Sequence, residues 1–362
     1  MEPRDALQSE RIEVDDDAAS FYELSLQVGW GDGLPLLPAT EARVLELLAA
    51  VPHAPDHVVA LLPPRRGAAT IEKIAINAAM AGVEPAAFAY VVAALAALAQ
   101  PDHNLYGLVT TTSSATSALV VNGPRRSELG FDHEAGCLGG GAGRGSMTVG
   151  RAVQLCLRNI GGQVAGTTSK TVFGNPARIT GLCFAEWEER SPWPSLAVQR
   201  GFAPTDEVVT VHAAKGLLMF ADGNTHDTRD LVALIAKTLA YPLGNAFHGP
   251  PGRGQTMLLV NPMWATRFHA VFPRVEDLQA ELLLHAWQPI EAWPATARVV
   301  LADKGRVESD GRVVMHAAPD QFAIVVCGGL GNLQATVLPT WGDTTMQSAL
   351  IERKLDHRES QG

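Results

Sequence analysis

The sequence has few cysteines, and no two of them form a Cys-x-x-Cys pair. The four cysteines, Cys137, Cys156, Cys183 and Cys327, are widely separated along the 362 residues. This spacing excludes the disulfide framework of a small secreted domain and the ligand pattern of a structural zinc site. We therefore expect a reducing, cytoplasmic compartment, no metal and no other cofactor.

Basic charge and long apolar runs are also lacking. The chain has 28 Lys and Arg against 38 Asp and Glu, a net charge of −10, so we expect neither nucleic acid nor a membrane as a partner. The longest apolar run, residues 86–99, has 14 residues, which is too short to span a bilayer and predicts a buried helix. Residues 1–17 are polar and acidic, without the features of a signal peptide.

The apolar pattern predicts an α/β protein with mixed or parallel sheets flanked by helices. Hydrophobic residues make up 47% of the chain and charged residues 18%, which supports a sizeable core. Short apolar runs predict strands at residues 58–62, 104–109, 118–122, 179–184, 208–212, 256–260, 298–302 and 321–327. Periodic apolar segments predict helices at residues 18–28, 41–50, 70–82, 84–100, 152–160, 230–238 and 275–286.

A cluster of glycines and prolines at residues 244–254 divides the chain into two predicted subdomains. Residues 18–243 would form an α/β domain with a glycine-rich loop, and residues 255–350 would form a smaller α/β domain. We expect residues 1–17 to be a mobile arm and residues 351–362 to be a charged tail.

The densest glycine run lies at residues 136–151, directly before a periodic apolar segment. Glycine lets the backbone approach a ligand closely, and a helix N-terminus favours an anion. The run lacks the Gly-Lys-Ser/Thr of a phosphate loop, and no suitably placed acidic residue supports a dinucleotide site. A small carboxylate-bearing ligand is therefore the favoured occupant.

Paired arginines and a hydroxyl-rich segment are expected to complete the pocket around this run. Arginines on stiff turns after strands clamp carboxylates, and hydroxyls donate hydrogen bonds to a ligand. Two alternatives stay open: the arginines pair with surface acids, or the Ser and Thr side chains satisfy their own turns. The predicted substrate-binding residues are Arg65, Arg66, Thr111, Thr112, Ser113, Arg125, Gly140, Gly141, Gly143, Arg144 and Ser146.

Four side chains are candidates for catalysis. Cys137 lies near a helix N-terminus and arginines, which favour a thiolate, and His133 and Glu134 precede it closely. His226, followed by Asp227, is a further acid/base candidate. The alternatives are that Cys137 is a small buried hydrophobe, that His133 is a hydrogen-bonded loop histidine, and that Asp227 only caps a helix.

A second candidate site lies near the C-terminus of the predicted strand at residues 321–327. Cys327 ends this strand, and Gly328 and Gly329 follow it; His248, in the breaker cluster, belongs to the same candidate site. The carboxyl ends of parallel strands, followed by glycines, are where ligands approach such sheets.

Several short motifs together resemble an uncharacterised bacterial family of about this length. They are Asp32-Gly-Leu-Pro, Pro64-Arg-Arg-Gly, Thr70-Ile-Glu-Lys, Val121-Asn-Gly-Pro, Thr148-Val-Gly-Arg-Ala, Glu186 with Ser191-Pro-Trp, and Val326-Cys-Gly-Gly. Members of that family accompany, or are fused to, a small (seleno)cysteine-Gly-Ser-Cys (UGSC-type) protein, so the resemblance implies a small thiol protein as a partner. Where that family carries Pro-Glu-His-Ala, this chain has Pro262-Met-Trp-Ala. The resemblance implies no particular reaction.

These features favour an enzyme that acts on a small carboxylate-bearing metabolite as a lyase or hydrolase. The arginines would bind the anion, the glycine-rich amides would stabilise negative charge, and Cys137 or His226 would attack or move a proton. One alternative is a redox enzyme that uses Cys137 and Cys327 with a partner thiol protein. Another is a non-catalytic ligand-binding subunit. Tryptophan-rich loops and the prevalence of twofold assemblies suggest a homodimer.

Overall fold

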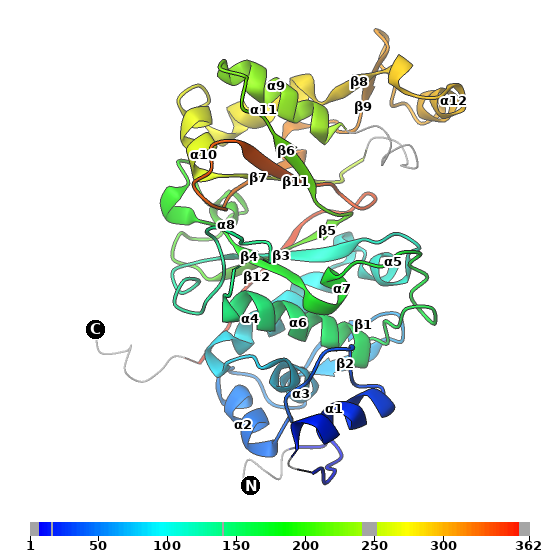
Figure 1. The fold of residues 1–362 in the computed structure, drawn as a ribbon, viewed down its shortest axis with the longest axis vertical. Helices are drawn as coiled ribbons and strands as arrows, with labels where there is room; N and C mark the ends of the chain where they lie inside the picture. The colour runs from blue at the N-terminus through cyan, green and yellow to red at the C-terminus, as the bar shows by residue number, and fades with distance from the viewer. Residues whose placement is uncertain (1–6, 16, 140, 241–251, 355–362) are drawn as a thin grey trace.

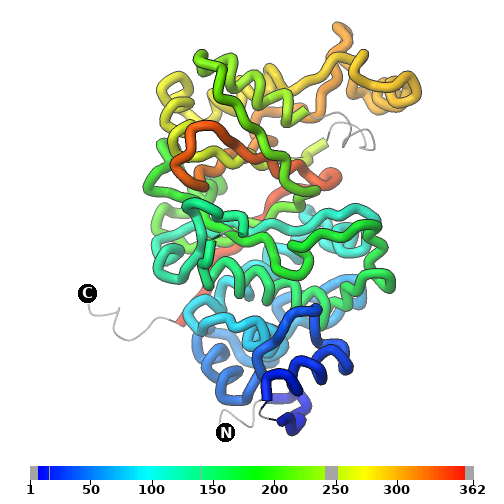
Figure 2. The backbone as a smooth tube through the Cα atoms, in the orientation of Figure 1, coloured from blue at the N-terminus to red at the C-terminus, as the bar shows by residue number. Residues whose placement is uncertain are grey.

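Two four-stranded sheets lie face to face, and helices cover the outer face of each sheet. The computed structural model describes residues 7–15, 17–139, 141–240 and 252–354. Figure 1 shows the resulting order of layers, which is helices, first sheet, second sheet and helices, and Figure 2 traces the chain through them. The predicted α/β class, with mixed sheets flanked by helices, is confirmed.

The first sheet has the strand order β12-β5-β3-β4, and the second has the order β10-β7-β11-β6. In each sheet, one neighbouring pair is parallel and the other pairs are antiparallel. The strands of the first sheet are β3 (Thr116–Asn122), β4 (Leu182–Ala185), β5 (Val208–Ala214) and β12 (Gln347–Leu350). Those of the second are β6 (Leu218–Ala221), β7 (Thr256–Val260), β10 (Phe322–Val326) and β11 (Gln334–Leu338).

The first sheet is covered by α4 (Pro85–Leu98) and α6 (Arg144–Asn159), and α2 (Glu41–Ala49) and α3 (Ile71–Ala81) pack against these helices on the side away from the sheet. The second is covered by α9 (Thr228–Leu239), α10 (Pro262–His269) and α11 (Val275–His285). Smaller helices are α1 (Ala18–Gln27), α5 (Leu105–Thr110), α7 (Ala177–Thr180), α8 (Leu196–Gln199) and α12 (Ala295–Asp303). Two small antiparallel sheets accompany them: β1 (Val58–Leu62) with β2 (Gly67–Thr70), and β8 (Trp287–Pro289) with β9 (Arg312–Val314).

Alternation along the strands explains this layering. In β3, Leu119 and Val121 join the core beneath the helices, whereas Ala118 and Val120 join the core between the two sheets. Every residue of β3 is buried, as expected of a strand that is covered on both faces. The strands β7 and β10 are likewise buried throughout. The space between the sheets therefore receives every second side chain of the inner strands.

The two sheets repeat one strand arrangement and exchange their last strands. The strands β3, β4 and β5 are paired in the same way as β7, β10 and β11. The next strand along the chain crosses over in both halves, because β6 follows β5 but pairs with β11, and β12 follows β11 but pairs with β5. Residues 18–243 and 255–350, which the glycine and proline cluster separates in the sequence, thus each contribute one strand to the other's sheet.

Two predicted strands are helical. The apolar residues 104–109 predict a strand, but Asn104 caps α5 by accepting a hydrogen bond from the N–H of Gly107 at 3.2 Å. Residues 298–302 also predict a strand, yet they lie in α12, where Val299 and Val300 are exposed and only Leu301 is buried. A run of apolar residues that is buried on one side only does not fit a sheet covered on both faces.

The predicted buried helix at residues 84–100 is α4, and nearly all of it is buried. Within the described ranges, no single helix has the length and hydropathy to cross a membrane. The consecutive segments Pro85–Leu98 and Pro101–Thr110 together have the length and composition of a membrane span, but a bend of 79° separates them.

Candidate functional site: two thiols at the meeting edge of the sheets

Four polar side chains lie where the parallel strands of both sheets end. Asn122 is the last residue of β3, and Glu186, Asn261 and Cys327 directly follow β4, β7 and β10. The alternation of the strands directs all four side chains into the layer between the sheets. The backbone N–H of Trp187 donates to the carbonyl oxygen of Val326 at 2.7 Å, which joins the ends of β4 and β10.

The internal repeat makes Glu186 and Cys327 equivalent positions. The N–H of Glu186 donates to Val121 O and the N–H of Cys327 donates to Val260 O, both at 3.1 Å, so each residue extends its parallel ladder by one step. Each therefore lies beside the asparagine that ends the neighbouring strand. The same dipeptide, Val-Asn, occurs at both strand ends. One half thus carries a carboxyl group where the other carries a thiol.

A pocket of about 480 Å³ opens at this edge of the second sheet. Its wall includes Cys137, Cys327 and Asn261, together with the backbone of Gly328 and Gly329. The side chain of Asn261 is fixed by two hydrogen bonds, from the N–H of Trp264 to Oδ1 at 2.9 Å and from Nδ2 to Gln334 O at 2.6 Å. The volume lies within the range of pockets that bind small molecules.

The structure brings the two candidate thiols together in this pocket. Cys137 and Cys327 are both free and buried, they lie in the same cluster between the sheets, and their side chains interact electrostatically. The interaction with Cys327 is the largest cause that lowers the pKa of Cys137. The same interaction, with burial and the charge of Glu186, raises the pKa of Cys327 well above its usual value. Cys137 is therefore the thiol of the pair that ionises first.

The other two cysteines have a different environment. Cys156 and Cys183 are buried in the core between the first sheet and its helices. Burial raises the pKa of both thiols. They are apolar core residues, which leaves Cys137 and Cys327 as the candidate reactive thiols.

Cys137 lies on the loop that connects β3 to α6, and the glycine-rich part of this loop holds a carboxylate of the chain itself. The N–H of Gly143 donates to both oxygens of Asp132, at 3.1 and 3.2 Å, and the N–H of Asp132 donates to Ser146 Oγ at 2.8 Å. A Cβ at Gly141 would lie 2.5 Å from Asp132 Oδ1, and one at Gly143 would clash with the same atom. The predicted ligand position at the start of α6 is thus occupied by Asp132.

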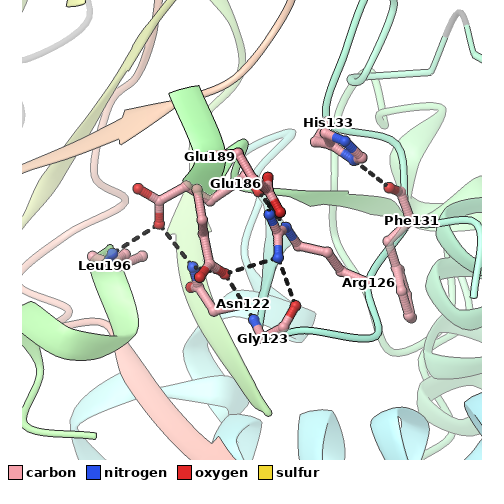
Figure 3. Close-up of polar contacts among 9 residues, drawn as sticks. Asn122, Gly123, Arg126, Phe131, His133, Glu186, Glu189 and Leu196 are labelled. Carbon is pink, nitrogen blue, oxygen red and sulfur yellow. Dashed lines mark hydrogen bonds and ion pairs between the residues drawn. The ribbon is translucent and has the colours of Figure 1, made fainter. Parts of the chain in front are cut away.

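A buried arginine ties the loop to the end of β4. Arg126 donates through Nε to Glu186 O at 2.8 Å and through Nη1 to Gly123 O at 2.7 Å, and it forms ion pairs with Glu188 and Glu189 (Figure 3). The binding residue predicted from the sequence is the neighbouring Arg125, whose side chain pairs with Glu128 on the surface. The Pro-Arg-Arg sequence marks both arginines as candidates. Burial, which the sequence does not show, distinguishes Arg126 from Arg125.

Glu186 stands out in the sequence only as part of a family-like motif. Its side chain is buried, and its Oε2 accepts hydrogen bonds from Asn122 Nδ2 at 2.8 Å and from the N–H of Leu196 at 2.7 Å (Figure 3). Burial is the main cause that raises its pKa to about 7. Perturbed carboxyl groups of this kind occur often at functional sites.

The predicted histidines and Glu134 do not line the pocket. His133 is bound through Nδ1 to Phe131 O at 3.0 Å (Figure 3). Its backbone oxygen accepts the N–H of Gly328 at 2.8 Å. Glu134 is largely exposed, and so is His226. Asp227 caps α9, which is the alternative kept open for that pair. His248 and Gly140 lie outside the described residues.

The predicted arginine and hydroxyl walls do not gather around the glycine run. Arg65 lies against Gly161 and Gly162, past the C-terminus of α6, and Arg66 follows it on the same turn. The 16 residues of α6 separate this turn from the glycine run by roughly 24 Å, at about 1.5 Å per residue. A single pocket that includes both is therefore a wrong prediction, because the two lie at opposite ends of one helix.

Three further predicted binding residues lie before β3, at the opposite end of the strand from Asn122. Thr111 accepts the N–H of Ser113 at 3.1 Å, and the carbonyls of Thr112 and Ser113 bind the segment that contains Thr171 and Val172. These contacts match the alternative in which the hydroxyls satisfy their own turn. Arg144 forms an ion pair with Glu84, which is exposed.

Comparison with known protein families, curated proteins and solved structures gives no match to this chain. Among the residues that the structure describes, no group of three or more His, Cys, Asp or Glu side chains is arranged to hold a metal ion. The chemistry of the site therefore has to be argued from its own side chains.

Proposed function

We propose that this protein is a thiol enzyme that reduces a small disulfide by means of Cys137 and Cys327. The observation that carries the proposal is that two buried thiols of one cluster lie in the wall of the same pocket. One thiol has a lowered pKa and the other a raised pKa, and this difference divides the roles between nucleophile and resolving thiol.

The reaction would proceed in two exchange steps. The Cys137 thiolate attacks one sulfur of the substrate disulfide, a mixed disulfide forms, and the other half of the substrate leaves as a thiolate. Cys327 then attacks the sulfur of Cys137, the second half leaves, and a disulfide joins Cys137 and Cys327. The substrate gains two electrons, which the two cysteines lose.

A further thiol reductant has to restore the dithiol after each turnover. The small thiol protein implied by the sequence resemblance is one such reductant, and a low-molecular-weight dithiol is another. A reducing cytoplasm fits this proposal, because its thiol pools would return the pair to the reduced state.

Mass spectrometry after brief exposure to a small disulfide tests the proposal. With dipyridyl disulfide, the native protein should end with a Cys137–Cys327 disulfide and no retained pyridyl group. Cys327→Ser should retain one pyridyl group on Cys137, and Cys137→Ser should react slowly. Cys156→Ser is the matched control, because its thiol is buried away from the pocket, and it should behave as the native protein does.

Failure of the native protein to form the Cys137–Cys327 disulfide would contradict the proposal. The predicted lyase or hydrolase activity on a carboxylate stays a prediction, since its arginines are not gathered at the pocket. An enzyme that loses turnover with Cys137→Ser but keeps it with Cys327→Ser would favour that alternative, with Cys137 as a nucleophile in group transfer.

A further inference from the structure

A resolving thiol needs a proton acceptor, and Cys327 is poorly placed to lose its proton to water. It is buried, and its pKa is raised, first by the interaction with Cys137. Once Cys137 is consumed in a mixed disulfide, this thiolate partner is gone. The ionisable group that still acts on Cys327 is the carboxyl group of Glu186.

The position of Glu186 suits the role of acceptor. Glu186 and Cys327 follow the edge strands β4 and β10, and the Trp187–Val326 hydrogen bond joins these two strand ends at 2.7 Å. Both side chains enter the same layer between the sheets. Both donors to Glu186, Asn122 Nδ2 and the N–H of Leu196, bind Oε2, so neither of them engages Oε1.

The surroundings of Glu186 leave its carboxyl group able to exchange a proton near neutral pH. The charged groups that act on it are Glu188, which opposes its ionisation, and Arg126, which favours it. Arg126 donates hydrogen bonds to the backbone oxygens of Glu186 and Gly123. Its ion pairs are with Glu188 and Glu189 and not with the Glu186 carboxylate. The carboxyl group is therefore not locked in its charged form by an ion pair.

Other acidic or basic side chains near the pocket are engaged elsewhere. Asp132 acts on Cys137, and both of its oxygens accept the N–H of Gly143. Glu188 accepts the N–H of Gly123 at 2.7 Å and Asn122 Nδ2 at 3.1 Å through the same oxygen. His133 is fixed to Phe131 O and faces Trp187 with its ring.

We propose that Glu186 is the proton acceptor for Cys327 in the resolving step, an assignment that rests on the proposed dithiol function. As Cys327 Sγ attacks Cys137 Sγ, its proton passes to the Glu186 carboxylate, directly or through one water. The bond between Cys137 and the substrate sulfur breaks, and the electron pair leaves with the substrate thiolate. When the disulfide is reduced again, the proton returns from Glu186 to Cys327.

Stopped-flow kinetics with dipyridyl disulfide separates the two steps. Attack by Cys137 releases the first thiopyridone, and attack by Cys327 on the mixed disulfide releases the second. In the native protein, the rate of the second release should rise with pH up to about pH 7 and then level off. Glu186→Gln keeps an oxygen to accept from Asn122 and Leu196, so it is expected to fold.

Glu186→Gln should leave the first release within about twofold of native and slow the second about 100-fold at neutral pH. The slowed rate should keep rising with pH above about pH 7, as ionisation of Cys327 itself becomes limiting. Glu188→Gln is the matched control, because it makes the same change on the same loop and contacts the same asparagine. Its second release should keep the native rate at neutral pH and should still level off, at a somewhat lower pH because Glu188 no longer opposes the ionisation of Glu186.

Glu186→Asp is a second test, because it keeps a carboxyl group. The rate of its second thiopyridone release should still level off near neutral pH, even if Glu186→Gln folds poorly. Equal second-release rates and pH profiles in the native protein and Glu186→Gln would overturn the assignment alone. Absence of a second release in the native protein would overturn the dithiol function and the assignment together.

Discussion

The carboxylate of Asp132 accepts the backbone N–H of Gly143 through both oxygens, at 3.1 and 3.2 Å. This contact holds the residue that precedes α6, on the loop that also carries Cys137. It supplies, within the chain, the negative charge that a helix N-terminus favours. The glycines of the run are required here because a Cβ at Gly141 or Gly143 would collide with the same carboxylate.

Asp132 also acts on the reactive thiol, which gives a first prediction. Its charge opposes the ionisation of Cys137 and raises the pKa of that thiol, against the larger lowering effect of Cys327. Asp132→Asn keeps one oxygen to accept the N–H of Gly143 and removes the charge. We expect faster alkylation of Cys137 by iodoacetamide at neutral pH, by about two- to tenfold, with a change in stability below about 1 kcal/mol.

Peptide mapping with timed iodoacetamide labelling would measure this rate. The matched control is Asp227→Asn, which changes the cap of α9 and should leave the labelling of Cys137 at the native rate. A labelling rate for Asp132→Asn at or below native would contradict the electrostatic role given to Asp132.

Local sequence patterns predict several strands and helices that surround the site, but neither β6 and β11, which line the pocket, nor the proximity of the two thiols. The apolar runs at residues 118–122, 256–260 and 321–327 correspond to β3, β7 and β10, since strands buried on both faces read as continuous apolar segments. The glycines after Cys327 correctly mark a strand end. The strand prediction for residues 104–109 is wrong because the cap by Asn104 outweighs their apolar character.

The pairing of Cys137 with Cys327 depends on an arrangement that no local pattern encodes. It requires the two sheets to face each other and their parallel strands to end at the same edge. The repeated Val-Asn dipeptide at residues 121–122 and 260–261 was the available signal, because it marks equivalent strand ends in the two halves. The prediction for the arginines is wrong because the sequence does not place the ends of α6 relative to the strands.

The buried carboxyl of Glu186 predicts a loss of stability as pH rises. Its pKa in the folded protein is raised, mainly by burial, to about 7, above the ordinary value of 4.5. Between these two values the folded state holds the proton more tightly than the unfolded state, so the free energy of unfolding falls with rising pH. Glu186→Gln removes the ionisation and should gain up to about 3 kcal/mol relative to native above about pH 7, with little gain near pH 4.

Urea unfolding of both proteins at several pH values would measure this difference. Glu188→Gln serves again as the control: its stability should still fall with rising pH, with the fall shifted to somewhat lower pH because Glu188 no longer raises the pKa of Glu186. A difference between Glu186→Gln and native that stays constant from acid to neutral pH would contradict a proton held by Glu186 in the folded state.

Two buried histidines predict the opposite trend on the acid side. Burial lowers the pKa of His103 to about 3 and that of His212 to about 4, and the ring of His212 bonds to Leu338 O in the other sheet at 3.0 Å. Below about pH 6.5 these histidines are protonated in the unfolded state but stay neutral in the folded state. Their contribution to the free energy of unfolding is therefore present above that pH and is lost as the pH falls towards 4. His212 alone should account for about 3 kcal/mol of this loss.

His212→Gln should flatten the acid limb of the stability curve, measured by urea unfolding between about pH 4 and about pH 7. His226→Gln is the control, because His226 is exposed, and its curve should follow the native one. An acid limb as steep in His212→Gln as in the native protein would show that the proton uptake arises elsewhere.

The close crossing of α6 with the segment before β4 gives the last prediction. Gly181 has a φ of +75°, and a Cβ there would overlap the backbone of Gly150 in α6. Gly201 also has a positive φ, +91°, but no atom lies within 4 Å of the position that a Cβ would take there, so it shares the backbone strain without the collision. Alanine at Gly201 should cost about 1 kcal/mol, and alanine at Gly181 at least about 3 kcal/mol, because backbone cannot yield as a side chain can. Urea midpoints of the two variants measure this gap, and similar losses in both would mean that α6 moves away from β4 at little cost.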